Sequence, residues 1–211
     1  MDAEAILNEA QNTVMGVDTG AGGLKVSTGT AGIQIPAQVS ANGGHLMQAN
    51  VIGLEQAEPP THVSTPAGDF WIGTGAHQWG RPLETLDNSR FRGSPGMAAL
   101  FYGALERHIR QHGTDLSVIE KAYIGLPQQA AAEPGLTDAV KAWLEGEHTW
   151  RVDDGLERYL DLREVRVTTQ PVAALFDYLL TDSGESVEGR RGDFKHEVGV
   201  ISIGMSTVEM L

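Results

Sequence analysis

Hydrophobic and polar residues along the chain follow two alternating patterns, one typical of strands and one of helices. Apolar residues recur at helical spacing in three segments: residues 95–112, GLTDAVKAWLEG and PVAALFDYLLTD. Short apolar runs around them predict strands at VMGVD, LKVSTG, IQIPAQVS, GDFWIGTG, SVIEKAYIGLP, 148–152, LREVRVTTQ and EVGVISIGMSTVEML. Strands that alternate with helices of this length indicate an α/β layered domain.

Local signals predict where some of these elements begin and end. Ser94 and Pro95 have the character of an N-cap and a first helical residue, and Gly113 is a typical helix stop. Pro36 predicts a sheet edge or a bend, because proline has no N–H to donate to a neighbouring strand. Residues 1–12 are expected to form a short polar helix or a frayed arm.

Charge and cysteine content narrow the class of protein. The sequence has 15 basic and 28 acidic residues, a net charge of −13 at pH 7, and no cysteine. This balance argues against direct binding of nucleic acid, which needs a basic face to displace counterions, and against binding to an anionic membrane. The lack of cysteine excludes a disulfide scaffold, a zinc finger and a thiol nucleophile, and favours a cytoplasmic location.

The first candidate site is the octet DTGAGGLK, from Asp18 to Lys25. A carboxylate ends one predicted strand, a glycine turn follows, and a lysine begins the next strand. Backbone N–H groups in such a turn form an anion-binding concavity, the lysine adds a positive charge for a phosphate, and the aspartate can hold hydrated Mg²⁺. The spacing matches neither a Walker loop nor GxGxxG, and an ordinary hairpin with a surface lysine is the alternative.

Two further segments carry related chemistry. Residues 202–209, SIGMSTVE, form a second strand–glycine–strand turn; alone it is a plain hairpin, but with the first turn it can grip a phosphate chain from both sides. Gln170 lies where a predicted strand meets a predicted helix, at the sheet edge where open α/β sheets bind ligands. A glutamine there can orient a water for attack on a phosphate, or it is a strand-end residue that the backbone satisfies.

In this order, the segments GVDTGAGGLK, YIGLP, QPVAAL and ISIGMSTVE resemble the actin-like ATPase superfamily, most closely the bacterial and archaeal actin-like proteins of the plasmid-segregation (ParM) type. FWIGTGA and NSRFRGSP are similar to the smaller subdomain of that group. The resemblance extends from Val14 to Leu211. It implies an α/β fold, an actin-like (RNase H-like) lobe with a mixed five-stranded sheet, flanking helices and a small inserted subdomain.

The resemblance also divides the chain into a two-segment core, an inserted small subdomain, a mobile loop and the phosphate-2 hairpin: residues 14–35 with 95–183, 36–94, 184–196 and 197–211. The hairpin would open a second lobe, which holds the purine site in this family. Because the sequence stops at Leu211 within an apolar strand, we expect a truncated chain or one half of a split protein. These 211 residues alone are then expected to be weak or inactive as an ATPase.

Carried over by position, the resemblance assigns roles to single residues. Asp18 corresponds to the metal-associated, catalytic aspartate, Lys25 to the phosphate-contacting basic residue, and Gln170 to the residue that positions the attacking water. The ligands implied are ATP or GTP and Mg²⁺. Ser202 stands where the family usually carries aspartate, which places the hydrolysis rate in doubt more than nucleotide binding. The two phosphate-binding turns comprise Gly20, Ala21, Gly22 and Gly23, and Gly204, Met205, Ser206 and Thr207.

Three functions remain open at this point. The first is a nucleotide-dependent protein that polymerises with itself into filaments, hydrolyses nucleotide, and serves plasmid or DNA segregation through a DNA-binding adaptor. The second is a small-molecule kinase of the same superfold, although the strand ends YIGLPQQ and TTQPVA offer no catalytic aspartate. The third is a non-catalytic half-actin assembly module, which Ser202 and the missing second lobe favour.

Other polar residues have mainly structural interpretations. His108 and His112 are four residues apart on a predicted helix and can ligate a metal, but no adjacent acid completes a zinc-protease pattern. Their place in the last turns instead suits the helix dipole. The acidic residues Asp153, Asp154 and Glu157 are expected to form a solvated turn that starts a helix.

Overall fold

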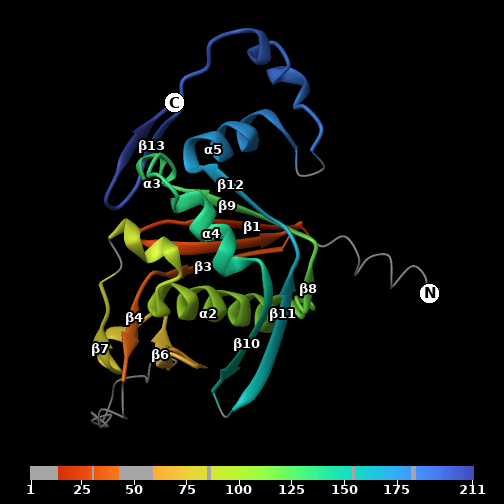
Figure 1. Cartoon of the computed structure of the whole chain (residues 1–211). Helices are drawn as coiled ribbons and strands as arrows, with labels where there is room; N and C mark the ends of the chain where they lie inside the picture. The colour runs from red at the N-terminus through yellow and green to blue at the C-terminus, as the bar shows by residue number, and fades with distance from the viewer. Residues whose placement is uncertain (1–13, 30, 43–58, 85–86, 154, 182–183) are drawn as a thin grey trace, which may run out of the picture.

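The structure is a computed structural model that describes residues 14–29, 31–42, 59–84, 87–153, 155–181 and 184–211 (Figure 1). The helix or arm expected at residues 1–12 lies outside the described residues.

A mixed five-stranded sheet forms the centre of the fold, as the sequence predicts. The spatial order is β12-β9-β1-β2-β3, with β1, β2 and β3 antiparallel to one another in turn and β9 and β12 parallel to β1. Alternate residues of β1 and β2 are buried, in keeping with the two-residue period of a strand. The strands are β1 Val14–Thr19, β2 Gly23–Thr28, β3 Ala31–Pro36, β9 Lys121–Leu126 and β12 Val165–Thr169.

A second sheet of seven strands has the order β7-β4-β6-β5-β10-β11-β8. Its strands are β4 Val39–Ala41, β5 Thr61–Thr65, β6 Gly68–Ile72, β7 Arg81–Pro82, β8 Val118–Ile119, β10 Gly146–Val152 and β11 Leu156–Leu162. Strands from the predicted insertion, residues 36–94, therefore share this sheet with β8, β10 and β11, which follow it in the chain. The domain boundaries given by the sequence remain a prediction.

Two segments predicted as single strands are divided between the two sheets. IQIPAQVS becomes the end of β3 and the start of β4, because Pro36 ends the outer strand of the first sheet and the chain then bends. SVIEKAYIGLP becomes β8 and β9, which break at Glu120 because β8 pairs with β11 and β9 pairs with β1 and β12. Pro36 thus lies at both a sheet edge and a bend, as predicted. The prediction that IQIPAQVS and SVIEKAYIGLP each form one continuous strand was wrong.

The helix expected to start near Asp153 is also wrong, since this segment is the turn of the β10–β11 hairpin. Asp153 and Gly155 have φ values of 44° and 89°, in the left-handed region, so the chain reverses instead of starting a helix. Leu160 and Leu162 of β11 are fully buried against the core. Asp154 lies outside the described residues.

The long helix α2, Pro95–His112, lies between the two sheets (Figure 1). Its ends are those predicted: the Ser94 side chain accepts a hydrogen bond from the Met97 N–H at 3.2 Å, and Gly113 is left-handed with φ 66°. On the other side of the five-stranded sheet lies α5, Gln170–Leu179. The remaining helices are α3 Gln128–Ala131 and α4 Leu136–Leu144, with short 3₁₀ turns η1 Ala76–Gln78, η2 Asn88–Arg92, η3 Glu188–Arg190 and η4 Asp193–Lys195.

A buried charge cluster joins α2 to the second sheet. The Glu106 side chain is fully buried and accepts hydrogen bonds from Arg110 at 2.6 Å and from Arg158 of β11 at 2.7 Å. Arg110 also pairs with Asp153 in the β10–β11 turn. Burial alone raises the pKa of Glu106, but hydrogen bonds and charges from Arg158 and Arg110 outweigh it and hold the pKa below its ordinary value.

The chain ends in a small hairpin of β13, Ile201–Ile203, and β14, Val208–Met210, which lies beside α5 and α3 (Figure 1). Ile201, Ile203, Val208 and Met210 are all more than 60% exposed. Among the described residues, no helix is long and apolar enough to cross a membrane.

Candidate functional site

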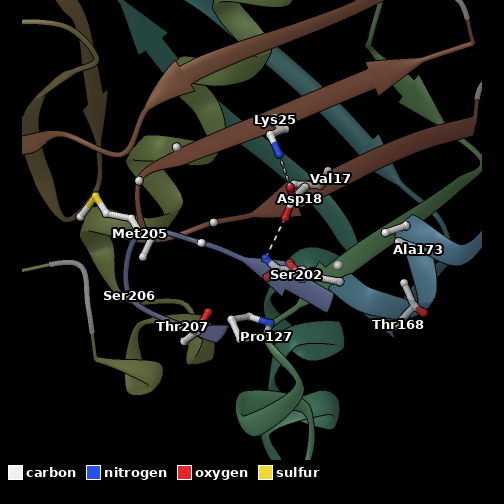
Figure 2. Close-up of a pocket in the computed structure, with 18 of the residues that line it drawn as sticks. Val17, Asp18, Lys25, Pro127, Thr168, Ala173, Ser202, Met205, Ser206 and Thr207 are labelled. Atoms are coloured by element: carbon white, nitrogen blue, oxygen red, sulfur yellow. Dashed lines mark hydrogen bonds and ion pairs between the residues drawn. The ribbon is translucent and has the colours of Figure 1, made fainter. Parts of the chain in front are cut away.

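A cavity of about 1130 Å³ lies at the edge of the five-stranded sheet where β1, β9 and β12 end. This volume is slightly above the usual range for small-molecule sites, so it accommodates a ligand of nucleotide size. Figure 2 shows Met205, Ser206 and Thr207 of the C-terminal hairpin on one side of the cavity and Thr168 and Ala173 on the other.

The residues to which the resemblance assigns a catalytic, metal-binding or phosphate-binding role all line this cavity. They are Asp18, Gly20, Ala21, Gly22, Gly23, Lys25, Gln170, Gly204, Met205, Ser206 and Thr207. The fold thus brings together three segments that lie far apart in the sequence. The chemical role of each residue stays a prediction.

Asp18 is the centre of a three-residue contact. Asp18 and Lys25 are directly opposite in the β1–β2 pair, and the Lys25 Nζ lies 2.7 Å from Asp18 Oδ2 (Figure 2). Gln170, at the start of α5, donates from Nε2 to Asp18 Oδ1 at 2.7 Å. Because a carboxylate only accepts hydrogen bonds, this contact fixes the orientation of the Gln170 amide and leaves its Oε1 as an acceptor.

The Asp18–Lys25 pair is open to solvent. Their side chains are 37% and 54% exposed, respectively. Exposed ion pairs contribute little to stability, because water screens them. The two groups are therefore held together weakly and can exchange partners when an anion or a cation enters the cavity.

The turn between β1 and β2 is tight. A Cβ atom at Gly20 would lie 2.9 Å from the Gly23 carbonyl oxygen, closer than side chains allow, so residue 20 must be glycine for this turn to form. Thr19, which precedes the turn, is held to the neighbouring strand β9, because its Oγ1 donates to the Gly125 carbonyl at 2.8 Å.

The second turn faces the first. Met205 packs against Gly22, and a Cβ atom at Gly22 would lie 3.2 Å from the Met205 sulfur. Within the second turn, the Gly204 N–H donates to the Thr207 carbonyl at 2.8 Å. The two turns therefore meet at Gly22 and Met205, and both line the same cavity.

Ser202 lies opposite Glu209 in the β13–β14 pair. Glu209 is only 6% exposed, and its Oε1 accepts a hydrogen bond from the Gln128 N–H at 2.7 Å. This contact fastens the hairpin to α3. Ser202 itself lines the cavity.

Arg90 is a cavity residue that the sequence analysis missed. It lies on η2, in the segment NSRFRGSP to which the sequence analysis assigned no chemical role, yet it is 8% exposed and lines the cavity beside Asn88. Its guanidinium donates to the Thr19 carbonyl at 3.3 Å. Burial lowers the pKa of Arg90, an effect that the negative charge of Glu84 opposes. One local pattern in the sequence could have pointed to Arg90. It is next to a phenylalanine, in a segment that begins with a residue suited to cap a helical turn, Asp87.

The two histidines of α2 have backbone or hydroxyl partners. His108 Nε2 lies 3.1 Å from Thr28 Oγ1, and His112 Nε2 lies 3.1 Å from the Gly32 carbonyl. Burial lowers the pKa of His108. No group of three or more metal-ligating side chains occurs among the described residues.

A family model described as "Actin like proteins N terminal domain" matches residues 16–172. This range contains the first turn, η2 and Gln170. It ends before the β13–β14 hairpin. No curated protein matches the sequence.

Several solved structures have the same fold. The actin-like protein Alp7A is 12% identical with a TM-score of 0.68, over 91% of this chain and 54% of that one. The archaeal actin homologue Ta0583, in complex with ADP, is 22% identical with a TM-score of 0.52, over 77% and 46%. A 15-stranded ParM filament from Clostridium botulinum is 16% identical with a TM-score of 0.59, over 94% and 58%. The chain thus spans about half the length of these proteins.

Proposed function

The chain belongs to the family of actin-like proteins, through their N-terminal domain, and from this premise we propose that it is the phosphate-binding part of a nucleotide-dependent filament protein. ATP or GTP is the ligand proposed for the cavity. The observation that carries this proposal is the pair of glycine turns, in contact at Gly22 and Met205, which line one cavity together with Asp18, Lys25 and Gln170. The ADP bound to the similarly folded Ta0583 supports the same ligand class.

Within this site, Lys25 is proposed to leave Asp18 and to contact a phosphate. An ammonium group held only by an exposed ion pair can change partners at little cost. Gln170 is proposed to orient the attacking water through Oε1, because its Nε2 is already committed to Asp18. These roles use atoms that the structure leaves accessible at the cavity.

The residues fit a magnesium ion of the kind that accompanies nucleotides. Mg²⁺ usually keeps several waters and is held by one or two carboxylates together with substrate phosphates, so a single carboxylate such as Asp18 is sufficient on the protein side. When bound, Mg²⁺ would neutralise charge on the phosphates. The two oxygens of Asp18 now accept from Lys25 and Gln170, and at least one must be released for this role.

We also propose that the protein assembles with itself and serves DNA segregation, on the basis of the solved structures that share its fold. The ParM filament of C. botulinum has this fold, so further copies of this chain are the proposed partners. The net charge of −13 makes a DNA-binding adaptor the proposed route to any DNA cargo.

A non-catalytic assembly module is the second candidate. Ser202 favours it, because the residue lines the cavity where the family usually has a carboxylate. Such a protein would bind nucleotide and assemble without releasing phosphate.

The test is sedimentation and phosphate release by the product of the complete reading frame that contains this chain. With micromolar protein, ATP or GTP and Mg²⁺, we expect protein in the pellet only when nucleotide is present. Pelleting without phosphate release would favour the non-catalytic candidate. No pelleting and no phosphate release with either nucleotide would refute the filament proposal.

A further inference from the structure

Arg90 has an unusual environment for a charged side chain. It is 8% exposed, and its buried Nε has no hydrogen-bond partner among the described residues. Its guanidinium donates to the Thr19 carbonyl at 3.3 Å and lies over the Phe91 ring at 4.5 Å. Burial of a cation is costly because hydration is lost, and the negative charge of Glu84 opposes this effect on Arg90 only in part.

The segment that holds Arg90 is firmly anchored. Asp87 caps η2 by accepting from the Ser89 N–H at 2.7 Å, and the Trp143 indole of α4 donates to the Phe91 carbonyl at 2.8 Å. Phe91 is only 2% exposed. Arg90 is therefore positioned by its neighbours on η2 and by α4, and it needs little rearrangement to meet a ligand.

Arg90 lies next to the glycine turn between β1 and β2. Thr19, which accepts its hydrogen bond, directly precedes the glycines of the β1–β2 turn, and Arg90 lines the same cavity as those glycines and Lys25. Arginine binds phosphate through a planar fork of N–H donors, and the buried Nε–H of Arg90 has no partner among the described residues.

We infer that Arg90 is a second cationic contact for the phosphates of the ligand, supplied by η2 and acting together with Lys25 of β2. This inference rests on the proposed nucleotide site and adds a residue to it. A phosphate near Arg90 would satisfy the unpartnered Nε–H and offset the cost of its burial. Since η2 directly precedes α2, the contact would also tie ligand binding to the connection between the two sheets.

Substitution of Arg90 tests the inference with two probes, sodium tripolyphosphate and Mg-ATP, on the product of the complete reading frame. Calorimetry should show that R90Q weakens tripolyphosphate binding by about 10-fold to 100-fold, the loss expected for a hydrogen bond to a charged group. R90K, which keeps the charge but not the fork, should fall between R90Q and wild type. The matched control is R92Q, which changes an arginine of the same turn that pairs with Glu133; it should stay within about twofold.

A measurement on the unaltered protein covers the case in which R90Q fails to fold. The Arg90 Nε–H resonance, assigned by its absence in R90K, should shift on titration with tripolyphosphate. An unchanged resonance at saturating tripolyphosphate, or wild-type affinity for both probes in R90Q, would overturn the inference and leave Arg90 as a support for Thr19.

The outcomes separate this inference from the proposed function. Filament formation with ATP together with wild-type phosphate affinity in R90Q would overturn the role of Arg90 alone. Arg90-dependent tripolyphosphate binding without any nucleotide-dependent pelleting would support the role of Arg90 and reject the filament proposal. If the wild-type protein binds neither probe, both are rejected.

Discussion

Gln170 and Asp18 are 152 residues apart in the sequence and are joined by a 2.7 Å hydrogen bond from Nε2 to Oδ1. The bond connects the first strand of the sheet to the first residue of α5. It links the residue proposed to orient water to the residue proposed to face a metal ion, so that neither side chain is free to turn away.

Replacement of Gln170 by alanine should separate hydrolysis from binding. We expect Q170A to lower phosphate release by about 100-fold, because a residue that positions a reacting proton or water contributes on this scale. Nucleotide affinity should change by less than about threefold, since the phosphate contacts lie elsewhere. Single-turnover phosphate release and calorimetry measure the two quantities. The control is Q78A, an exposed glutamine on η1 outside the cavity; equal losses in both variants would reject the role.

Lys25 should matter for ligand binding and very little for folding. Its 54% exposed side chain and its ion pair with Asp18 predict that K25A changes the free energy of unfolding by less than about 1 kcal/mol. The affinity for Mg-ATP should fall by about 10-fold or more, because a charge-assisted phosphate contact is lost. Urea unfolding and calorimetry test the two halves of this prediction. K121A, which removes the lysine paired with Glu164, should leave the affinity unchanged.

Replacement of Ser202 by aspartate is expected to increase the rate of phosphate release. S202D restores the carboxylate that the family usually carries and should raise phosphate release above the wild-type rate. It also places a second negative charge directly opposite the buried Glu209, so the free energy of unfolding should fall by about 0.5–1 kcal/mol. S202N supplies the same shape without charge and should show neither effect. An S202D protein as slow as wild type would favour the non-catalytic candidate.

Features with local causes were predictable from the sequence. The limits of α2 follow from Ser94, Pro95 and Gly113, whose capping and φ preferences act within one turn. The two glycine turns were also found, because the strand–glycine–strand pattern is contiguous.

Features that depend on distant pairing were not predictable. The seven-stranded sheet joins β5 to β10 and β11 to β8, and neither pairing leaves a mark in the local hydrophobic pattern. The acidic residues near Asp153 suit a helix start as well as a hairpin turn, and pairing of β10 with β11 decides between them. Arg90 was missed because its contact with Thr19 joins residues that are 71 positions apart in the sequence.

Glu106 should make stability depend on pH. Its pKa is lower in the folded protein than the ordinary value of 4.5, so its stabilisation is fully present above about pH 4.5 and is lost as the pH falls through the folded value. E106Q removes the charge between two arginines and should cost about 3 kcal/mol at pH 7, the low end for a broken buried pair because both arginines are partly exposed. The difference between E106Q and wild type should shrink below pH 4.5, which urea unfolding at several pH values measures. E157Q, which changes a carboxyl that is 68% exposed on β11, should leave the stability at pH 7 nearly unchanged, and a constant E106Q difference down to pH 3 would contradict the argument.

Gly103 allows α2 to approach β6, and its replacement should destabilise the fold although alanine is the better helix former. A Cβ atom at Gly103 would lie 2.7 Å from Ile72 Cγ2 and 2.9 Å from Ile72 Cβ, atoms that cannot swing away as the end of a long side chain can. Overpacking of about 1–3 kcal/mol should exceed the gain in helix propensity of about 1 kcal/mol. G96A is the matched control on the same helix, because its one tight contact would be with the end of the Leu83 side chain at 3.1 Å and the next, with Val39 Cγ1 at 3.8 Å, is ordinary; it should be neutral or stabilising. In urea unfolding, G103A should cost less in an I72A background than in the wild type, because Ile72 Cγ2 has been removed. Equal costs in the two backgrounds would show that close packing against Ile72 is not the cause.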